Sequence, residues 1–160
     1  MKLKTLFILL LAMVAFSATY AQKFSLRNEK RITLSVNWSE ATIVGYTDQE
    51  IINYEPDWEK DQPALLRHLW EKYNKKMGMQ LPGALNVTSN YTLELRPLTV
   101  NKNGDMLCYA VILDHEGTVV AQLPKFQAEG GHVGSFLNLV GDGMKSAGTQ
   151  LGKRIKKYTK

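Results

Sequence analysis

The sequence predicts an α+β fold: a two-layer sandwich in the order β-α-β-β-β-α, with a mostly antiparallel sheet and both helices on one face. Three observations predict it. Residues 31–38 alternate between apolar and polar side chains, residues 61–78 carry a helical pattern, and strand-like segments between residues 91 and 123 precede a second helical pattern. Helices placed before and after a run of neighbouring strands favour one sheet covered on one face.

The first 21 residues are typical of a cleavable signal peptide. Two lysines precede an apolar stretch at residues 6–16, and the small residues Thr19 and Ala21 stand before the expected cleavage point at Gln22. The stretch is shorter than the ~20 residues that span a bilayer. We therefore expect export to the periplasm, the outer surface or the medium, with no transmembrane segment after signal cleavage.

Residues 22–160 are predicted to form a single α+β domain, because no repeat, linker or low-complexity tract divides them. This length allows a core that buries about two-thirds of the surface of the unfolded chain. The net charge of +5 falls to +3 when the two lysines of the signal peptide are removed. So small a charge, without aromatic residues interleaved on one face, gives no support for nucleic-acid binding.

The first predicted strand covers residues 31–38, and residues 41–46 either continue it or add a short strand after a break. An acidic connection follows at residues 48–61. Pro56 disfavours a regular element within this connection.

The first helix is expected to begin with Asp61 as its N-cap and Pro63 in its first turn, where a missing N–H costs nothing. Gly78 is the expected C-cap. The apolar residues of this segment recur at helical spacing, and they are Leu65, Leu66, Leu69, Trp70, Tyr73 and Met77.

A second strand begins at Tyr91, and its apolar phase shifts after Pro97, which indicates a bulge or an edge position. The third strand, residues 106–113, is almost continuously apolar, so we expect it to be central and covered. It contains Cys108, the single cysteine, which we interpret as a small buried hydrophobic residue. A nucleophile or an intermolecular thiol is the alternative.

Two turns complete the predicted meander. Asn103 and Gly104 favour the type I′ turn of a tight hairpin between the second and third strands. The fourth strand covers residues 118–123 and is expected to end at Pro124, since proline interrupts the hydrogen-bond ladder of a strand.

Residues 140–157 allow two incompatible interpretations, a phosphate-binding loop or a helix rich in glycine. A Walker loop needs glycine directly before Lys-Ser, and here Met144 separates Gly143 from Lys145. A dinucleotide fingerprint needs a third glycine where Ser146 stands. The sequence therefore disfavours a phosphate site, and we expect no bound cofactor.

The helical interpretation sorts the same residues into clear faces, with Ser135 as N-cap. One apolar stripe is formed by Val133, Leu137, Val140, Met144, Ala147, Leu151, Ile155 and Tyr158. Beside it lies a shoulder of glycines at positions 134, 141, 148 and 152. Because each interior glycine costs a helix ~1 kcal/mol, the shoulder must be offset by close packing. We expect it to pack on the domain's own sheet; a partner helix or a membrane interface is the alternative.

A candidate interaction surface combines two exposed aromatics with the basic end of the second helix. Its residues are Tyr54, Trp58, Lys153, Arg154, Lys156 and Lys157. The aromatics suit partner contacts, unless they fold back as a lid over the core. The basic residues suit anionic lipid, polysaccharide or an acidic partner, unless they only complement the helix dipole in solvent.

No motif for catalysis or metal binding is apparent. The three histidines, at positions 68, 115 and 132, lack metal-ligand spacing, and the acidic connection lacks the alternation of a calcium loop. There is no G-x-S-x-G motif, and nothing selects a pair of carboxylates. Three Asn-x-Ser/Thr sequons begin at Asn37, Asn86 and Asn90, and their use depends on the host.

Two segments resemble a group of small exported bacterial envelope proteins of unknown function. They are Val36-Asn37-Trp38-Ser39 with residues 54–58, and residues 130–135 running into residues 139–143. The Ala21-Gln22 junction is similar to signal sequences of Gram-negative anaerobes. The element order is similar to the N-terminal domain of TolB, a likeness of topology that implies little about function. The resemblance carries over no catalytic residues.

We therefore expect a non-catalytic envelope or secreted module that binds an unknown protein or an anionic envelope component. One alternative is peripheral membrane association through the basic C-terminal helix. Another is a hydrolase of cell-wall or host glycans, which would require a deep polar pocket lined by two or more carboxylates.

Overall fold

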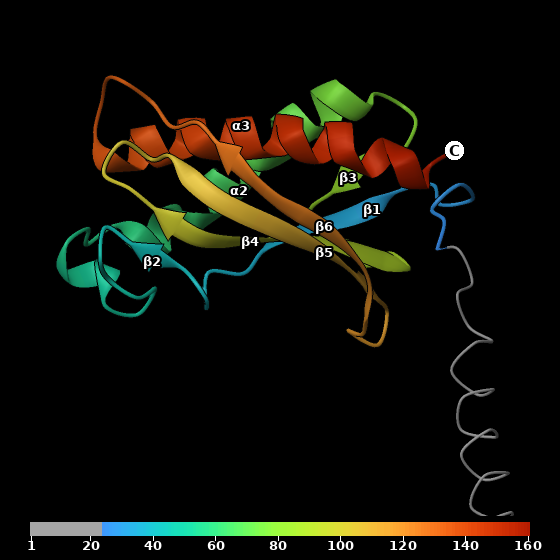
Figure 1. Ribbon diagram of the computed structural model, residues 1–160, viewed down its shortest axis with the longest axis horizontal. Helices are drawn as coiled ribbons and strands as arrows, with labels where there is room; N and C mark the ends of the chain where they lie inside the picture. The colour runs from blue at the N-terminus through green and yellow to red at the C-terminus, as the bar shows by residue number, and fades with distance from the viewer. Residues whose placement is uncertain (1–23) are drawn as a thin grey trace, which may run out of the picture.

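The computed structural model describes residues 24–160 (Figure 1). The predicted signal peptide lies outside the described residues. The elements are β1 (Ile32–Val36), β2 (Thr42–Ile43), η1 (Ile51–Asn53), α2 (Trp58–Met77), β3 (Gly83–Ala84), β4 (Tyr91–Val100), β5 (Met106–Asp114), β6 (Val119–Ala128), α3 (Phe136–Ile155) and η2 (Lys156–Tyr158).

The α+β sandwich is confirmed: one six-stranded sheet forms a layer, and α2 and α3 lie together on one face of it (Figure 1). The main path through the sheet is β3-β1-β4-β5-β6, with β2 paired to β4. The long strands form the predicted antiparallel meander β4-β5-β6. The short strands are parallel, since β1 pairs in parallel with β3 and β4, and β2 with β4. The chain therefore begins with a parallel β-α-β crossover from β1 through α2 to β4.

The core fills the space between the helices and the sheet. The inward side chains of β4 and β5 alternate with outward ones, as in a half-buried strand. Fully buried residues of these two strands are Leu93, Leu95, Met106, Cys108, Ala110 and Ile112. The prediction that residues 106–113 are central is confirmed, but helices cover only one face of the strand, and on the other face Val111 is the buried side chain. Leu107, Tyr109 and Leu113 are half-buried on the face that carries no helix.

The two helices run side by side in the same direction. A Cβ added to Gly141 would lie 3.1 Å from the His68 ring, and one added to Gly152 would lie 2.7 Å from the Lys76 Cβ. Between them, Gly148 lies against the backbone carbonyl of Leu69. Residue numbers therefore rise together along α2 and α3, and both helices end at the same end of the molecule.

The partner predicted for the glycine shoulder was wrong. Gly141, Gly148 and Gly152 are buried against α2, the other helix of the same layer, and not against the sheet. The physical reason is that a helix packed beside a second helix brings backbone to backbone, whereas the stripe that faces the sheet is filled by larger side chains. Gly134 lies before the helix, and Val133 is 88% exposed, so neither belongs to the predicted faces.

Helix α2 begins earlier than predicted. Its N-cap is Asp57, so the N-cap prediction at Asp61 was wrong and Pro63 lies inside the helix. Proline at this position removes one hydrogen bond to the carbonyl of Glu59. Trp58 in the first turn is fully buried, and this burial favours the early start of the helix. Gly78 is the C-cap, as predicted.

The structure corrects the predictions for Pro124 and for the turn at Asn103-Gly104, and it confirms the bulge after Pro97. Strand β6 runs through Pro124, which is tolerated because β6 is an edge strand. The turn at Asn103-Gly104 is not type I′, because only Gly104 has a positive φ. The bulge predicted after Pro97 is present between Pro97 and Thr99.

Candidate functional site

The predicted interaction surface is divided between opposite ends of the molecule. Tyr54 and Trp58 lie where α2 and α3 begin, and Lys153 to Lys157 lie where α3 ends. A 20-residue helix such as α3 is about 30 Å long. The six predicted residues therefore do not form one surface, and the two ends of the molecule are separate candidate sites.

The end where the helices begin carries a group of aromatic and aliphatic side chains, three of them exposed and Phe136 half-buried, which we call the aromatic end. Its residues are Tyr46, Ile52, Tyr54 and Phe136. Tyr46 and Tyr54 stack with ring centroids 5.9 Å apart, and Phe136 meets Tyr54 edge-on at 5.6 Å. Tyr54 is 47% exposed and Ile52 is 40% exposed. An apolar surface built from ordered rings is typical of protein contacts.

Trp58 lies beneath this group. It is not an exposed contact residue, and the alternative that it folds back over the core is confirmed. It is fully buried, it stacks on Phe136 at 6.4 Å, and its other neighbour is Trp38 at 5.0 Å. Its indole N–H donates a hydrogen bond of 2.8 Å to the carboxylate of Asp48. A large ring whose polar group is satisfied is stable inside the core, so Trp58 fixes the connection above it in place.

Acidic residues surround the aromatic end. They include Glu50 and Glu55 on the connection, and Asp57 and Glu59 at the start of α2. Hydrogen bonds from the amide and the hydroxyl of Thr47 lower the pKa of the Glu50 carboxyl, so it stays ionised in mildly acidic solution. Negative charge is also favourable where a helix begins, because the helix dipole is positive there.

The opposite end is basic and is assembled from three separate segments, which we call the basic end. Its exposed or half-buried residues are Arg27, Lys30, Arg31, Lys75, Lys76, Lys153, Lys156, Lys157 and Lys160. The segments are joined by short contacts: the amide of Leu26 donates to the carbonyl of Tyr158 at 2.7 Å, and Phe24 lies 5.5 Å from the Tyr158 ring. Lys76 meets α3 at Gly152. No acidic residue follows Asp142 in the sequence.

Arg154, one of the predicted contact residues, is partly withdrawn from this surface. It is half-buried, and its guanidinium carbon lies 4.9 Å from the centre of the Phe126 ring. This cation–π contact directs the side chain toward the β6 edge of the sheet. The other three predicted lysines remain at the surface.

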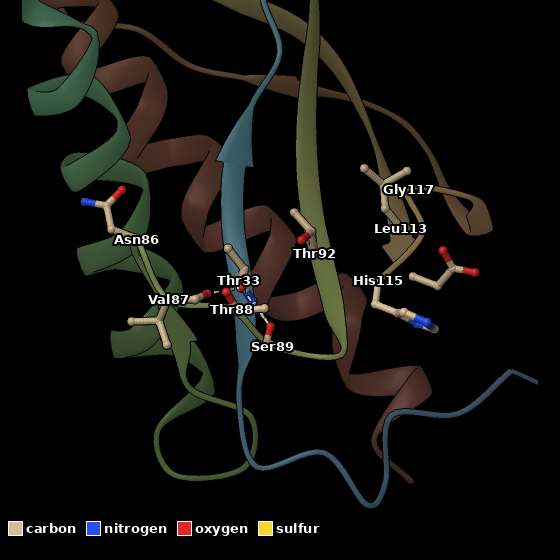
Figure 2. A pocket seen from close by; sticks show the side chains of 10 residues that line it. Thr33, Asn86, Val87, Thr88, Ser89, Thr92, Leu113, His115 and Gly117 are labelled. Carbon is tan, nitrogen blue, oxygen red and sulfur yellow. Dashed lines mark hydrogen bonds between the residues drawn. The ribbon is translucent and has the colours of Figure 1, made fainter.

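An open pocket of about 430 Å³ lies at the end of the uncovered sheet face (Figure 2). Its hydroxyl groups are largely used to hold the chain. Thr33 Oγ1 donates to the Val87 carbonyl and lies 2.7 Å from Ser89 Oγ, and Ser89 Oγ donates to the Tyr91 carbonyl. The hydroxyls therefore fasten residues 87–91 to β1.

This pocket lacks the chemistry of a glycosidase. Asp114 is the carboxylate that lines it, and that carboxylate accepts hydrogen bonds from the amides of Glu116 and Thr118. Glycoside hydrolysis uses two carboxyl groups across the scissile bond. The arrangement therefore gives no support to the hydrolase interpretation.

A charged network occupies the middle of the uncovered sheet face. Arg96 Nε lies 2.7 Å from Glu94, and its guanidinium also approaches Glu40 at 3.6 Å. Tyr109 donates to Glu40 at 3.0 Å. Hydrogen bonds from Arg96 to Tyr109 and Glu94 raise the pKa of Arg96. The network links β4, β5 and the connection between β1 and β2, which suits a structural role on an exposed face.

The cysteine and the potential metal ligands of the described chain form no further site. Cys108 is buried, and burial raises the pKa of its thiol to about 12, as expected for an unreactive core residue. Across residues 24–160, no three His, Cys, Asp or Glu side chains gather as metal ligands do. Over the same range, neither helix combines the length and hydropathy needed to cross a membrane.

Sequence reasoning missed Tyr46, Ile52 and Phe136 at the aromatic end, and the basic residues of segments 27–31 and 75–76. These residues are far apart in the chain, and local periodicity does not show that they meet. The one available signal was the glycine shoulder, because it required close contact between α3 and another backbone.

Comparison with known proteins gives distant structural similarities. No protein-family model matches the sequence, and no curated protein matches it. The chain is similar to a Xanthomonas campestris protein of family DUF330, with 11% identity, a TM-score of 0.46, and coverage of 85% of this chain and 90% of that chain. It is also similar to the PelC dodecamer of Paraburkholderia phytofirmans, with 8% identity, a TM-score of 0.41, and coverage of 75% and 88%.

A variant PelC dodecamer from the same organism shows 14% identity, a TM-score of 0.39, and coverage of 77% of this chain and 88% of that chain. All three similar chains are bacterial. Similarity at this level assigns neither a family nor an activity to the chain.

Proposed function

We propose that this chain is a non-catalytic binding or assembly module of the bacterial cell envelope, and that it binds a partner protein through its aromatic end. The observation that carries the proposal is the exposed stack of Tyr46 and Tyr54, supported by Phe136. Tyrosine and other aromatic residues are enriched among the side chains that contribute most to binding.

The aromatic end is ordered before any partner arrives. Tyr54 contacts Phe136, which stacks on the fully buried Trp58. Side chains already held in one arrangement lose little conformational entropy on binding. Surface tyrosines that lacked this support would be a weaker indication of a contact site.

The charges around the aromatic end define the chemistry of the partner. Glu50 and Glu55 give this end a negative rim, while Asp57 is paired with Lys60 at 3.4 Å. We propose that the partner presents an apolar patch with lysine or arginine at its edge, because complementary rim charges increase the rate of association and exclude acidic competitors.

The envelope location rests on the predicted signal peptide and on the resemblance of residues 130–143 to exported envelope proteins. We also propose that the chain is related in topology to the TolB N-terminal domain and that it comes from a Gram-negative anaerobe. Direct sequencing of the N-terminus of protein recovered from the envelope fraction tests the location, and Gln22 is the expected first residue.

A photo-crosslinking experiment tests the binding site. A crosslinking amino acid in place of the exposed Asn53 is brought into contact with native envelope extract, in the otherwise unchanged chain and in the double variant Ile52→Ser, Tyr54→Ser. We expect one dominant adduct that the double variant reduces at least tenfold, since losing two hot-spot contacts costs roughly 2 kcal/mol or more.

The matched control is Met79→Ser with Val119→Ser, which removes two exposed apolar side chains elsewhere on the surface. This control should retain the adduct. An adduct that survives in the first double variant, or that disappears equally in both, would refute the aromatic end as the binding site.

A further inference from the structure

The described chain begins at the basic end of the domain. Phe24 packs edge-on against Tyr91 and Tyr158, and Leu26 is hydrogen-bonded to Tyr158. The N-terminal segment therefore enters the fold at the basic end, beside the C-terminus of the chain (Figure 1).

The apolar stretch of residues 6–16 lies shortly before this entry point in the sequence. Seven residues, 17–23, lie between Phe16 and Phe24, and the eight residue steps from Phe16 to Phe24 reach at most about 28 Å. Insertion of the predicted signal peptide of the precursor into a membrane would therefore bring the basic end, and not the aromatic end, toward the lipid.

The charge distribution favours the same orientation. Both helices end at the basic end, with Lys75 and Lys76 in the last turn of α2 and Lys153 and Arg154 in that of α3. Arg27, Lys30 and Arg31 lie on the adjoining N-terminal segment, where the acidic Glu29 is hydrogen-bonded to Asn90. The acidic aromatic end lies at the other end of the helices. Near an anionic bilayer, electrostatic attraction turns the basic end of such a molecule toward the lipid.

We infer that the basic end is a docking surface for an anionic lipid bilayer, and that it orients the domain with its aromatic end away from the membrane. Exposed lysine and arginine side chains bind anionic headgroups by long-range attraction and need no preformed pocket. The orientation leaves the aromatic end free for a partner protein, but it does not depend on that partner.

Vesicle binding tests the inference. The chain from Gln22 to Lys160 contains every described element, and it is mixed with vesicles of phosphatidylcholine alone or of phosphatidylcholine with phosphatidylglycerol. We expect binding only to the anionic vesicles, and weaker binding at high salt because the charges are exposed and screened. Each lysine near an anionic surface raises binding roughly fivefold.

Two triple variants with equal charge loss localise the effect. Lys153→Gln, Lys156→Gln, Lys157→Gln should weaken binding on the order of 100-fold. The matched control Lys60→Gln, Lys102→Gln, Lys125→Gln removes three lysines that lie outside the basic end and should change binding little. Equal losses in the two triple variants would overturn the inference, because they would indicate attraction to net charge alone.

Fluorescent labels test the orientation. An environment-sensitive dye is attached to Thr159→Cys or to Ile52→Cys, while the buried Cys108 stays unlabelled in the folded protein. Anionic vesicles should shift the emission of the dye at position 159 and leave that at position 52 unchanged. A shift at position 52 would overturn the inference.

Two further outcomes also overturn it. One is equal binding to neutral vesicles. The other is salt-sensitive self-association without vesicle binding, which would show that the basic end contacts the acidic end of a second copy. Neither outcome affects the crosslinking test of the aromatic end, so the two proposals fail separately.

Discussion

Gly148 shows how one absent Cβ sets the distance between the two helices. A Cβ at this position would meet the backbone carbonyl of Leu69 on α2, and a backbone atom cannot rotate away as a side chain can. Gly141, two turns earlier on the same shoulder, faces the His68 ring, which can move. The two glycines look equivalent in the sequence, yet they differ in what they contact.

We therefore predict different costs for the same substitution at the two positions. Gly148→Ala should lower the free energy of unfolding by about 2–3 kcal/mol, because overpacking outweighs the gain in helix propensity. Gly141→Ala should stay within about 1 kcal/mol of the unchanged protein, since the gain of ~1 kcal/mol offsets a tight contact. Urea unfolding of both variants measures the difference, and equal stabilities would contradict the packing described for Gly148.

The thiol of Cys108 should be unreactive while the protein is folded. Burial raises its pKa to about 12, so almost no thiolate exists at pH 8. We expect a thiol reagent to modify Cys108 only after denaturation, at a rate limited by opening of the fold. Rapid modification of the native protein at pH 8 would contradict its burial.

At the scale of elements, the hairpin between β4 and β5 is attached to the start of α3. The Asp105 carboxylate accepts hydrogen bonds from the Gly130 amide and the Asn101 side chain. Gly104 and Gly143 let the hairpin backbone approach the helix closely. This contact accounts for Gly104, Gly130 and Gly143, because a Cβ added to any of them would meet backbone atoms across it.

The Asp105 attachment should depend on pH. Hydrogen bonds from Asn101 and Gly130 lower the pKa of the carboxyl, so its contribution to stability is complete above the unfolded value of about 3.9 and is lost as pH falls through the folded value. We predict that Asp105→Asn lowers the urea midpoint at pH 7. The difference should shrink as pH falls through the lowered pKa of the folded protein, where the wild-type carboxyl becomes protonated. A pH-independent difference would contradict an ionic contribution.

At the scale of the whole molecule, the two ends of the described chain are joined. Leu26 donates to the Tyr158 carbonyl at 2.7 Å, and Phe24 packs on the Tyr158 ring. The contact closes the basic end and brings Arg27 beside the end of α3. Charge is consequently distributed unevenly along the helices: Glu59 and Asp61 lie in the first turn of α2, and basic residues occupy the last turn of both α2 and α3.

Removing residues 158–160 should release the N-terminal segment. We expect a loss of about 1–3 kcal/mol from one hydrogen bond and one aromatic contact, measured by thermal or urea unfolding. Hydrogen exchange at the Leu26 amide should accelerate in parallel. Deletion of Lys160 alone is the control and should leave both measurements unchanged; unaltered exchange in the longer deletion would show that Tyr158 does not hold the segment.

The local elements were determined by the sequence. Alternation defined β1 and the meander, helical spacing with Ser135 as N-cap defined α3, and Gly78 ended α2. These features depend on residues within a few positions of each other, so periodicity and capping suffice to predict them. The boundary errors at Asp61 and Pro124 arose because burial of Trp58 and the edge position of β6 override local proline rules.

The tertiary structure alone decided which elements meet. It buried Trp58, placed the glycine shoulder on α2, and separated Tyr54 from Lys153 by the length of a helix. The physical reason is that contacts between distant segments depend on the direction and register of packed backbones. Local periodicity gives the faces of α2 and α3, but the parallel arrangement that creates an aromatic end and a basic end follows only from their packing.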